Sequence, residues 1–188
     1  MALPRGFKAD AERTAKRLRD AVGASPSKPL DLVAVAHEVG ATVVPADELI
    51  DIERLREIES IQAFAFSACT FDINEKKVIV YNPLRTPERR ASDIAHELAH
   101  VILEHELSEI QFLNEVPFRT CKSDQEEQAT ALGGTVLLPR PLLLSAATKG
   151  ISYSQLATKL GVTEDMARFR WNTTGVERQV SAARKRRA

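Results

Sequence analysis

The pentapeptide His-Glu-Leu-Ala-His, residues 96–100, is the most informative stretch of this 188-residue chain, because it has the form HExxH. The residues around it, from about 87 to 105, predict one continuous helix. At 3.6 residues per turn, His96 and His100 lie only about 40° apart around the helix axis, so both imidazoles leave the same face. Two neutral imidazoles at this spacing could hold one Zn²⁺, with Glu97 beside the open coordination position.

The rest of the predicted helix favours this interpretation over a chance match. A histidine on a helix more often makes an ordinary hydrogen bond, and isolated HExxH matches also arise by chance. Here the opposite face carries an apolar stripe that would anchor the helix in a core and leave the histidines toward a cleft. Carboxylates on the histidine face could orient an imidazole without touching the metal. The stripe consists of Ile94, Leu98, Val101 and Ile102, and the carboxylates are Asp93, Glu97 and Glu104.

Composition indicates an ordinary globular protein. The chain is 44% hydrophobic and has a formal net charge of zero, which suits one domain with a core large enough to fold without disulfides. Cys69 and Cys121 are too few for a disulfide framework, and we interpret both as thiols. Nothing near the N-terminus resembles a signal peptide, and no apolar run approaches the roughly 20 residues that cross a membrane. We therefore expect a cytoplasmic protein without a membrane partner; its oligomeric state does not follow from the sequence.

Charge is unevenly distributed along the chain. Residues 151–188 contain eight basic and three acidic groups, a net charge of +5, so residues 1–150 carry −5. Such asymmetry can indicate nucleic-acid contact, but a short basic run at a terminus is more often a solvated tail, which is the interpretation we favour. The expected organisation is a peptidase-like domain over residues 1–145, a small helical segment over 146–180 and a basic tail over 181–188.

Turn and capping signals predict the remaining elements. The strand before the HExxH helix leads directly into Thr86 and Pro87, a typical helix start. An edge strand beside such a helix can pair with an extended peptide substrate. The expected elements are helices over 7–22, 32–39, 123–138, 153–160 and 164–172, a strand over 42–44, helix or loop over 46–60, a hairpin over 61–82, and a loop over the cleft at 106–122.

A catalytic zinc site needs a third protein ligand. The metzincin pattern would place a histidine at position 106, which is glutamate here, and His105 would lie on the far side of the predicted helix. A glutamate from the helix at 123–138 remains, either Glu126 or Glu127. Glu126 lies on one stripe with small residues, including Gly133, that could approach the HExxH helix closely. The alternative is that residues 123–126 form a capping box in which Glu126 bonds back to the helix start.

Two segments together resemble the ImmA/IrrE family of bacterial and phage metallopeptidases. They are Arg-Arg-Ala-Ser-Asp-Ile-Ala-His-Glu-Leu-Ala-His (89–100) and Glu-Glu-Gln-Ala-Thr-Ala-Leu-Gly-Gly-Thr-Val-Leu-Leu-Pro (126–139). The family's second motif puts its ligand glutamate at Glu126, and Ala129, Leu137 and Pro139 also match. The departures are Thr130 in place of Asn or Asp, Leu132 in place of Phe, Gly133 and Gly134 in place of two alanines, and Leu138 in place of Met.

The resemblance implies an α+β fold with a zincin-like, gluzincin-type core. This core would hold a small antiparallel sheet and the HExxH helix, followed by C-terminal helices of helix-turn-helix type. It also implies a zinc endopeptidase with His96, His100 and Glu126 as metal ligands and Glu97 as the catalytic residue. The implied substrate is a cytoplasmic transcriptional repressor, commonly one with its own helix-turn-helix, cleaved in a stress, phage or mobile-element response.

Other functions remain as alternatives. Residues 151–174 have the helix, turn and helix pattern of a DNA-binding helix-turn-helix, with Arg168 and Arg170 on the second helix. The intervening Phe169 and Trp171, however, favour a fragment that packs on the rest of the protein. A zinc-containing sensor or scaffold without turnover is the other alternative.

Several further residues have a structural interpretation that we prefer to a functional one. Tyr81 and Tyr153 are candidates to stabilise an oxyanion, although packing suits both better. His37 lacks a second histidine nearby in the sequence, and we interpret it as structural.

Overall fold

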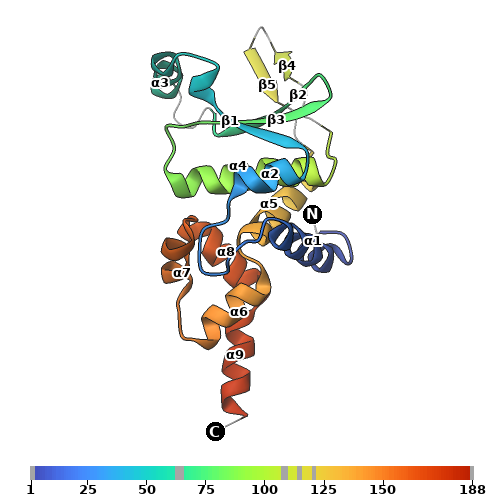
Figure 1. Ribbon diagram of the computed structural model, residues 1–188, viewed down its shortest axis with the longest axis vertical. Helices are drawn as coiled ribbons and strands as arrows, with labels where there is room; N and C mark the ends of the chain where they lie inside the picture. The colour runs from blue at the N-terminus through green and yellow to red at the C-terminus, as the bar shows by residue number, and fades with distance from the viewer. Residues whose placement is uncertain (1–2, 62–65, 107–109, 114–115, 120–121, 187–188) are drawn as a thin grey trace.

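The computed structural model describes residues 3–61, 66–106, 110–113, 116–119 and 122–186. It confirms an α+β architecture. A small sheet forms one layer with α3 beside it, the HExxH helix lies directly beneath the sheet, and helices α5 to α9 fill the opposite half of the molecule together with α1 (Figure 1). Cys121, part of the expected strand at 61–71, part of the expected loop at 106–122 and the end of the basic tail lie outside the described residues.

The sheet above the HExxH helix is mixed, whereas we expected a purely antiparallel sheet. Its order is β1 (Ala41–Pro45), β3 (Lys76–Tyr81) and β2 (Ala68–Ile73). β2 and β3 form the expected antiparallel hairpin, with Thr70 opposite Ile79. β1 pairs with β3 in parallel, because the long segment between them lets the chain return to the same end of the sheet. β2 is therefore an edge strand beside α4.

Two short helical elements and a second hairpin complete this half of the molecule. The segment expected to be helix or loop contains the 3₁₀ turn η1 (Ala46–Glu48) and helix α3 (Ile52–Ile61). Part of the expected loop at 106–122 instead forms a hairpin of β4 (Ile110–Leu113) and β5 (Val116–Arg119). The strands are only four residues long, too short for alternation to reveal them in the sequence.

Helix α4 (Pro87–Ile102) begins where the sequence predicts. Thr86 accepts a hydrogen bond from the Arg89 backbone N–H, and Pro87 occupies the first turn. Its apolar face, including Ile94 and Leu98, is buried in the core. The helix ends at Ile102, three residues before the expected end, because the chain turns sharply at the next residues.

Helix α5 (Ser123–Leu137) crosses α4 at very close range. A Cβ on Gly133 would lie 2.7 Å from the Ala95 carbonyl oxygen, so only glycine permits this contact. This confirms the close approach that the small-residue stripe predicts. Helix α1 (Phe7–Ala21) packs along the other side, where the buried Arg19 donates to the last carbonyls of α5, at Val136 and Leu137. Together these contacts fix α5 over the histidine face of α4.

The remaining helices continue the same hydrophobic core. Asp31 caps helix α2 (Leu32–Glu38), as expected. The other helices that contribute to this core are α6 (Arg140–Thr148), α7 (Tyr153–Leu160), α8 (Glu164–Thr174) and α9 (Val176–Lys185). The core cluster runs from Ala11 in α1 to Val176 in α9. The expected boundary at residue 145 falls inside α6, and residues 181–185 of the expected tail belong to α9, which projects away from the body (Figure 1).

Among the described residues, no single helix is long and apolar enough to cross a membrane. Helices α5 and α6 reach that length and apolarity only when taken as a pair, and they are bent by 52° at the break between them.

Candidate metal centre

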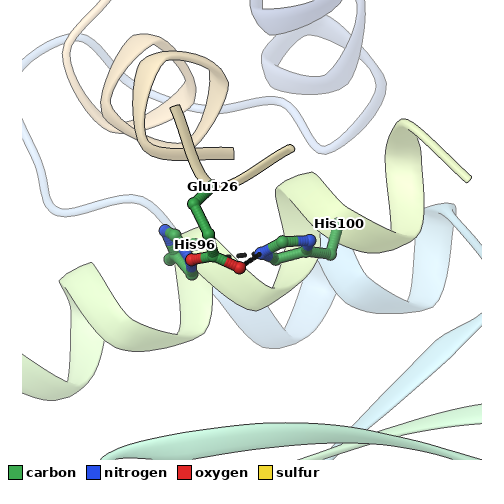
Figure 2. Close-up of side chains that lie close together, drawn as sticks. All are labelled: His96, His100 and Glu126. Atoms are coloured by element: carbon green, nitrogen blue, oxygen red, sulfur yellow. Dashed lines mark hydrogen bonds and ion pairs between the residues drawn. The ribbon is translucent and has the colours of Figure 1, made fainter. Parts of the chain in front are cut away.

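His96 and His100 leave α4 side by side, as their spacing predicts. Their Nε2 atoms lie 3.1 Å apart, and the two rings meet edge to face with centroids 4.8 Å apart. Both side chains point toward α5 rather than into the sheet (Figure 2). The two nitrogens therefore present their lone-pair positions to one point between the helices.

Glu126 reaches that point from α5. Its Oε2 lies 3.1 Å from His96 Nε2, and its Oε1 lies 3.4 Å from His100 Nε2 (Figure 2). The capping-box alternative is wrong, because the N-cap of α5 is Lys122 and no side chain caps the helix. Among the described residues, the cluster that could hold an ion contains Glu126 and does not contain Glu127, the other candidate. The structure thus brings Glu126, and not Glu127, to the two histidines.

The separations of these three side chains fit a tetrahedral ion. Zinc binds nitrogen and oxygen at about 2.0–2.2 Å, which places neighbouring ligand atoms of a tetrahedron roughly 3.3–3.5 Å apart. The three observed separations, from 3.1 to 3.4 Å, lie close to that range. One ligand atom from each residue lies within 4.8 Å of the others. Two imidazoles and a carboxylate are a donor set typical of catalytic zinc, which leaves a fourth position open.

The surroundings of His100 favour the neutral form of its imidazole, which a metal requires. Burial lowers the pKa of His100, and the neighbouring His96 lowers it further, while Glu126 and Glu97 oppose this change. A neutral imidazole keeps a lone pair for coordination. On the same helix, burial raises the pKa of Asp93, although Arg89, 2.9 Å away, opposes the shift. Asp93 is thus engaged by an arginine, not by an imidazole as the sequence suggested.

Glu97 lies beside the cluster and is held by a residue that sequence analysis missed. It is 9% exposed, and its Oε2 accepts a hydrogen bond from the Thr70 hydroxyl of β2 at 2.6 Å. Thr70 is itself buried, at 4% exposure. A threonine in a strand has no sequence signal for this role, since the contact spans 27 positions.

His105 is a second residue whose position the sequence did not predict. It lies beyond the end of α4, and its Nδ1 is 3.0 Å from Nδ1 of His100. Burial lowers the pKa of His105, while the side chain of Gln128 on α5 opposes this shift. The sequence interpretation was right that His105 does not join His96 and Glu126. It was wrong about the geometry, because it treated His105 as part of the helix.

A cleft of about 480 Å³ opens beside the cluster. Its walls come from β2, from the first half of α4, from α5 and from α8. His96 and Glu97 lie at one side, and Met166 and Phe169 of α8 lie at the other. The cleft therefore borders two residues of the HExxH segment and the Ala68 end of the edge strand β2.

The other residues considered from the sequence lie elsewhere. Tyr81 packs against the Arg90 guanidinium, 5.9 Å from the ring centroid. Tyr153 packs near Trp171, with ring centroids 6.3 Å apart. Both contacts are those of packing residues. His37 is exposed on α2, away from the cluster.

The two arginines expected on a DNA-recognition helix behave differently from each other. Arg168 is exposed and pairs with Asp165 on the same helix. Arg170 is buried, pairs with Glu12 of α1 at 2.8 Å and donates to the Leu138 carbonyl at 3.2 Å. The Arg170 face of α8 therefore packs inside the protein, where DNA cannot reach it.

The chain is similar to a family of known proteins and to a solved structure. Residues 54–172 match the family model of peptidase M78, described as the IrrE N-terminal-like domain. No curated protein matches the sequence. A solved Mycobacterium tuberculosis transcriptional regulator is similar in structure, with a TM-score of 0.50 and 18% identity. The similarity covers 88% of this chain and 46% of the regulator, so the chain spans about half the regulator's length and shares its fold over that part.

Proposed function

Since this chain belongs to the ImmA/IrrE family of metallopeptidases, whose model matches residues 54–172, we propose that it is a zinc-dependent endopeptidase of gluzincin type. His96, His100 and Glu126 would hold the metal, and Glu97 would be the catalytic residue. The observation that carries this proposal is the convergence of two imidazoles and a carboxylate at separations of 3.1–3.4 Å. The family match and the donor geometry support it independently of each other.

A bound zinc ion supplies Lewis acidity, which activates water near neutral pH and polarises a carbonyl group. The chain's own residues supply the proton transfers. Oε2 of Glu97 is engaged by Thr70, so Oε1 would take the proton of the attacking water and pass it to the leaving amine. Burial of Glu97 limits competing contacts with bulk water.

The proposed substrate is an extended segment of a protein, in particular of a helix-turn-helix repressor. β2 is an edge strand, and its Ser67 and Ala68 end borders the cleft next to Glu97. An extended peptide could pair with such an edge through backbone hydrogen bonds. Cleavage of a repressor would relieve repression in a stress, phage or mobile-element response.

Glu97→Gln tests the proposal most directly. The amide is nearly the same shape but cannot accept the water proton, so zinc content should stay at one equivalent while cleavage falls by orders of magnitude. Glu126→Ala should instead lower zinc content, and Glu127→Ala serves as its matched control with metal retained. Metal analysis and incubation with candidate repressors measure these outcomes. Wild-type protein that binds zinc but cleaves no faster than Glu97→Gln would favour the sensor alternative.

A DNA-binding function is the weaker candidate. Only Arg168 of the two expected arginines is exposed on α8, although the exposed basic residues of α9 remain available. An electrophoretic mobility shift that weakens steeply with salt would favour DNA binding, whereas no shift at low salt would remove it.

A further inference from the structure

His100 has a second hydrogen-bonding partner on the side of its ring that faces away from the cluster. Its Nε2 lies among His96 and Glu126, while its Nδ1 lies 3.0 Å from Nδ1 of His105. The two rings meet edge to face, with centroids 5.0 Å apart. His100 thus has a neighbour on each side of its ring, the cluster at Nε2 and His105 at Nδ1.

The end of α4 explains why His105 can reach His100. The His105 N–H donates to the His100 carbonyl at 3.0 Å, and the Glu104 N–H donates to the Val101 carbonyl at 3.2 Å. These two bonds, with Glu104 at φ 52°, make a Schellman motif, which folds the chain back over the last helical turn. The motif fixes the His105 backbone directly beside the residue that its side chain contacts.

The proton positions on these two rings follow from the chemistry of imidazole. A neutral histidine that gives its Nε2 lone pair to a metal carries its proton on Nδ1. That proton needs an acceptor, and His105 Nδ1 is at hydrogen-bonding distance. His105 must then carry its own proton on Nε2. The hydrogen bond between the two rings therefore selects the tautomer of each.

We infer that His105 is a positioning residue, which holds His100 in the tautomer and ring orientation that bind the metal. The inference rests on the metal centre of the proposed function and adds one residue to it. Groups that hydrogen-bond to a metal-bound histidine typically change metal affinity by about 10–100-fold when they are removed. His105 would do so without touching the ion.

A matched pair of variants tests the role. His105→Phe keeps an aromatic ring but removes the acceptor, whereas His105→Asn places an amide oxygen near the position of Nδ1. Zinc affinity, measured by competition with a chromogenic chelator, should fall about 10–100-fold in the Phe variant. It should be largely retained in the Asn variant. The control His37→Phe, on the exposed face of α2, should cause no loss.

Nuclear magnetic resonance gives a readout that a merely structural role would not change. In the zinc-loaded wild-type protein, the His100 Nδ1 proton should exchange slowly and show a nitrogen–nitrogen coupling to His105 across the hydrogen bond. The coupling should be absent from both variants, while the slowly exchanging proton should persist only in the Asn variant. Circular dichroism and thermal unfolding check that each variant is folded.

Two outcomes are distinguishable failures. If zinc binds the wild type but the Phe variant keeps the same affinity, or the Asn variant loses as much as the Phe variant, the role of His105 is wrong and the metal centre stands. If the wild type binds no zinc, the metal centre itself is wrong, and the inference falls with it.

Discussion

Thr70 and Glu97 show how a single contact prepares the proposed catalytic residue. The threonine hydroxyl on β2 donates to the carboxylate on α4 at 2.6 Å, and both side chains are buried. A hydrogen bond to a charged group contributes about 1.5–3 kcal/mol to stability. It also restricts the carboxylate to one orientation relative to His96, the next residue before it in the chain.

Replacing Thr70 should therefore affect turnover more than substrate binding. Thr70→Val keeps the shape of the side chain but removes the donor, and we expect kcat to fall about ten- to a hundredfold with little change in KM. Thr70→Ser, which keeps the hydroxyl, should restore most of the activity. Steady-state kinetics on a cleaved peptide measure both effects. A Val variant as active as the wild type would mean that the hydroxyl does not matter. Equal losses in the Val and Ser variants would mean that the fit of the whole side chain, rather than its hydroxyl alone, controls turnover.

The ends of the helices show which elements the sequence can predict. Asp31 and Thr86 mark their helix starts correctly, because a capping side chain acts within three residues. The sequence predicts an end of α4 that is three residues too late. A Schellman motif usually has glycine in the left-handed position, which is visible in a sequence, but here Glu104 occupies that position. The parallel pairing of β1 with β3 was also missed, since it depends on contacts between distant segments.

Glu104 at φ 52° costs conformational energy that glycine would not. The left-handed conformation destabilises a residue with a Cβ by about 1–2 kcal/mol. Glu104→Gly should stabilise the protein by roughly 1 kcal/mol, because the gain exceeds the flexibility that glycine adds to the unfolded chain. Urea denaturation measures the change. A less stable Gly variant would show that the Glu104 side chain makes a contact whose stabilisation exceeds the conformational energy of its left-handed backbone.

The crossing of α4 and α5 sets the distance between the histidines and Glu126. A Cβ at Gly133 would lie 2.7 Å from the Ala95 carbonyl oxygen and 3.1 Å from the His96 backbone nitrogen. Gly133→Ala must therefore push the helices apart, and we expect a loss of about 1–3 kcal/mol in stability together with weaker zinc binding. Gly134→Ala is the matched control for coordination, because its Cβ would meet side-chain atoms of Met166 and Arg170 on α8 and not the backbone of α4. It should therefore leave the distance between α4 and α5 unchanged.

Denaturation and zinc titration of the two alanine variants separate packing from coordination. The expected order is a larger loss of zinc affinity for Gly133→Ala than for Gly134→Ala. If Gly133→Ala binds zinc as the wild type does, the close crossing does not control the metal centre.

At the scale of the whole molecule, the C-terminal helices belong to the same body as the site. Arg170 of α8 reaches Glu12 of α1 and the carbonyl at the end of α5, while Arg19 of α1 donates to two carbonyls of that same end. The resemblance to a helix-turn-helix thus follows from local turn chemistry, with Gly161 in the left-handed conformation and Thr163 as N-cap. The tertiary role of the segment depends on Arg170, whose burial no local pattern reveals.

Arg170→Met tests this interpretation on the intact protein. The substitution leaves Glu12 and the Leu138 carbonyl without their partner, and because the Arg170 side chain is 8% exposed and that of Glu12 is 27% exposed, we expect a loss of about 3 kcal/mol. Arg168→Met removes an exposed ion pair on the same helix and should cost less than about 1 kcal/mol. Urea denaturation compares the two variants, and a DNA-binding assay on each tests the alternative. If Arg170→Met unfolded like the wild type while Arg168→Met abolished a measurable DNA affinity, α8 would be a recognition helix rather than a wall of the cleft.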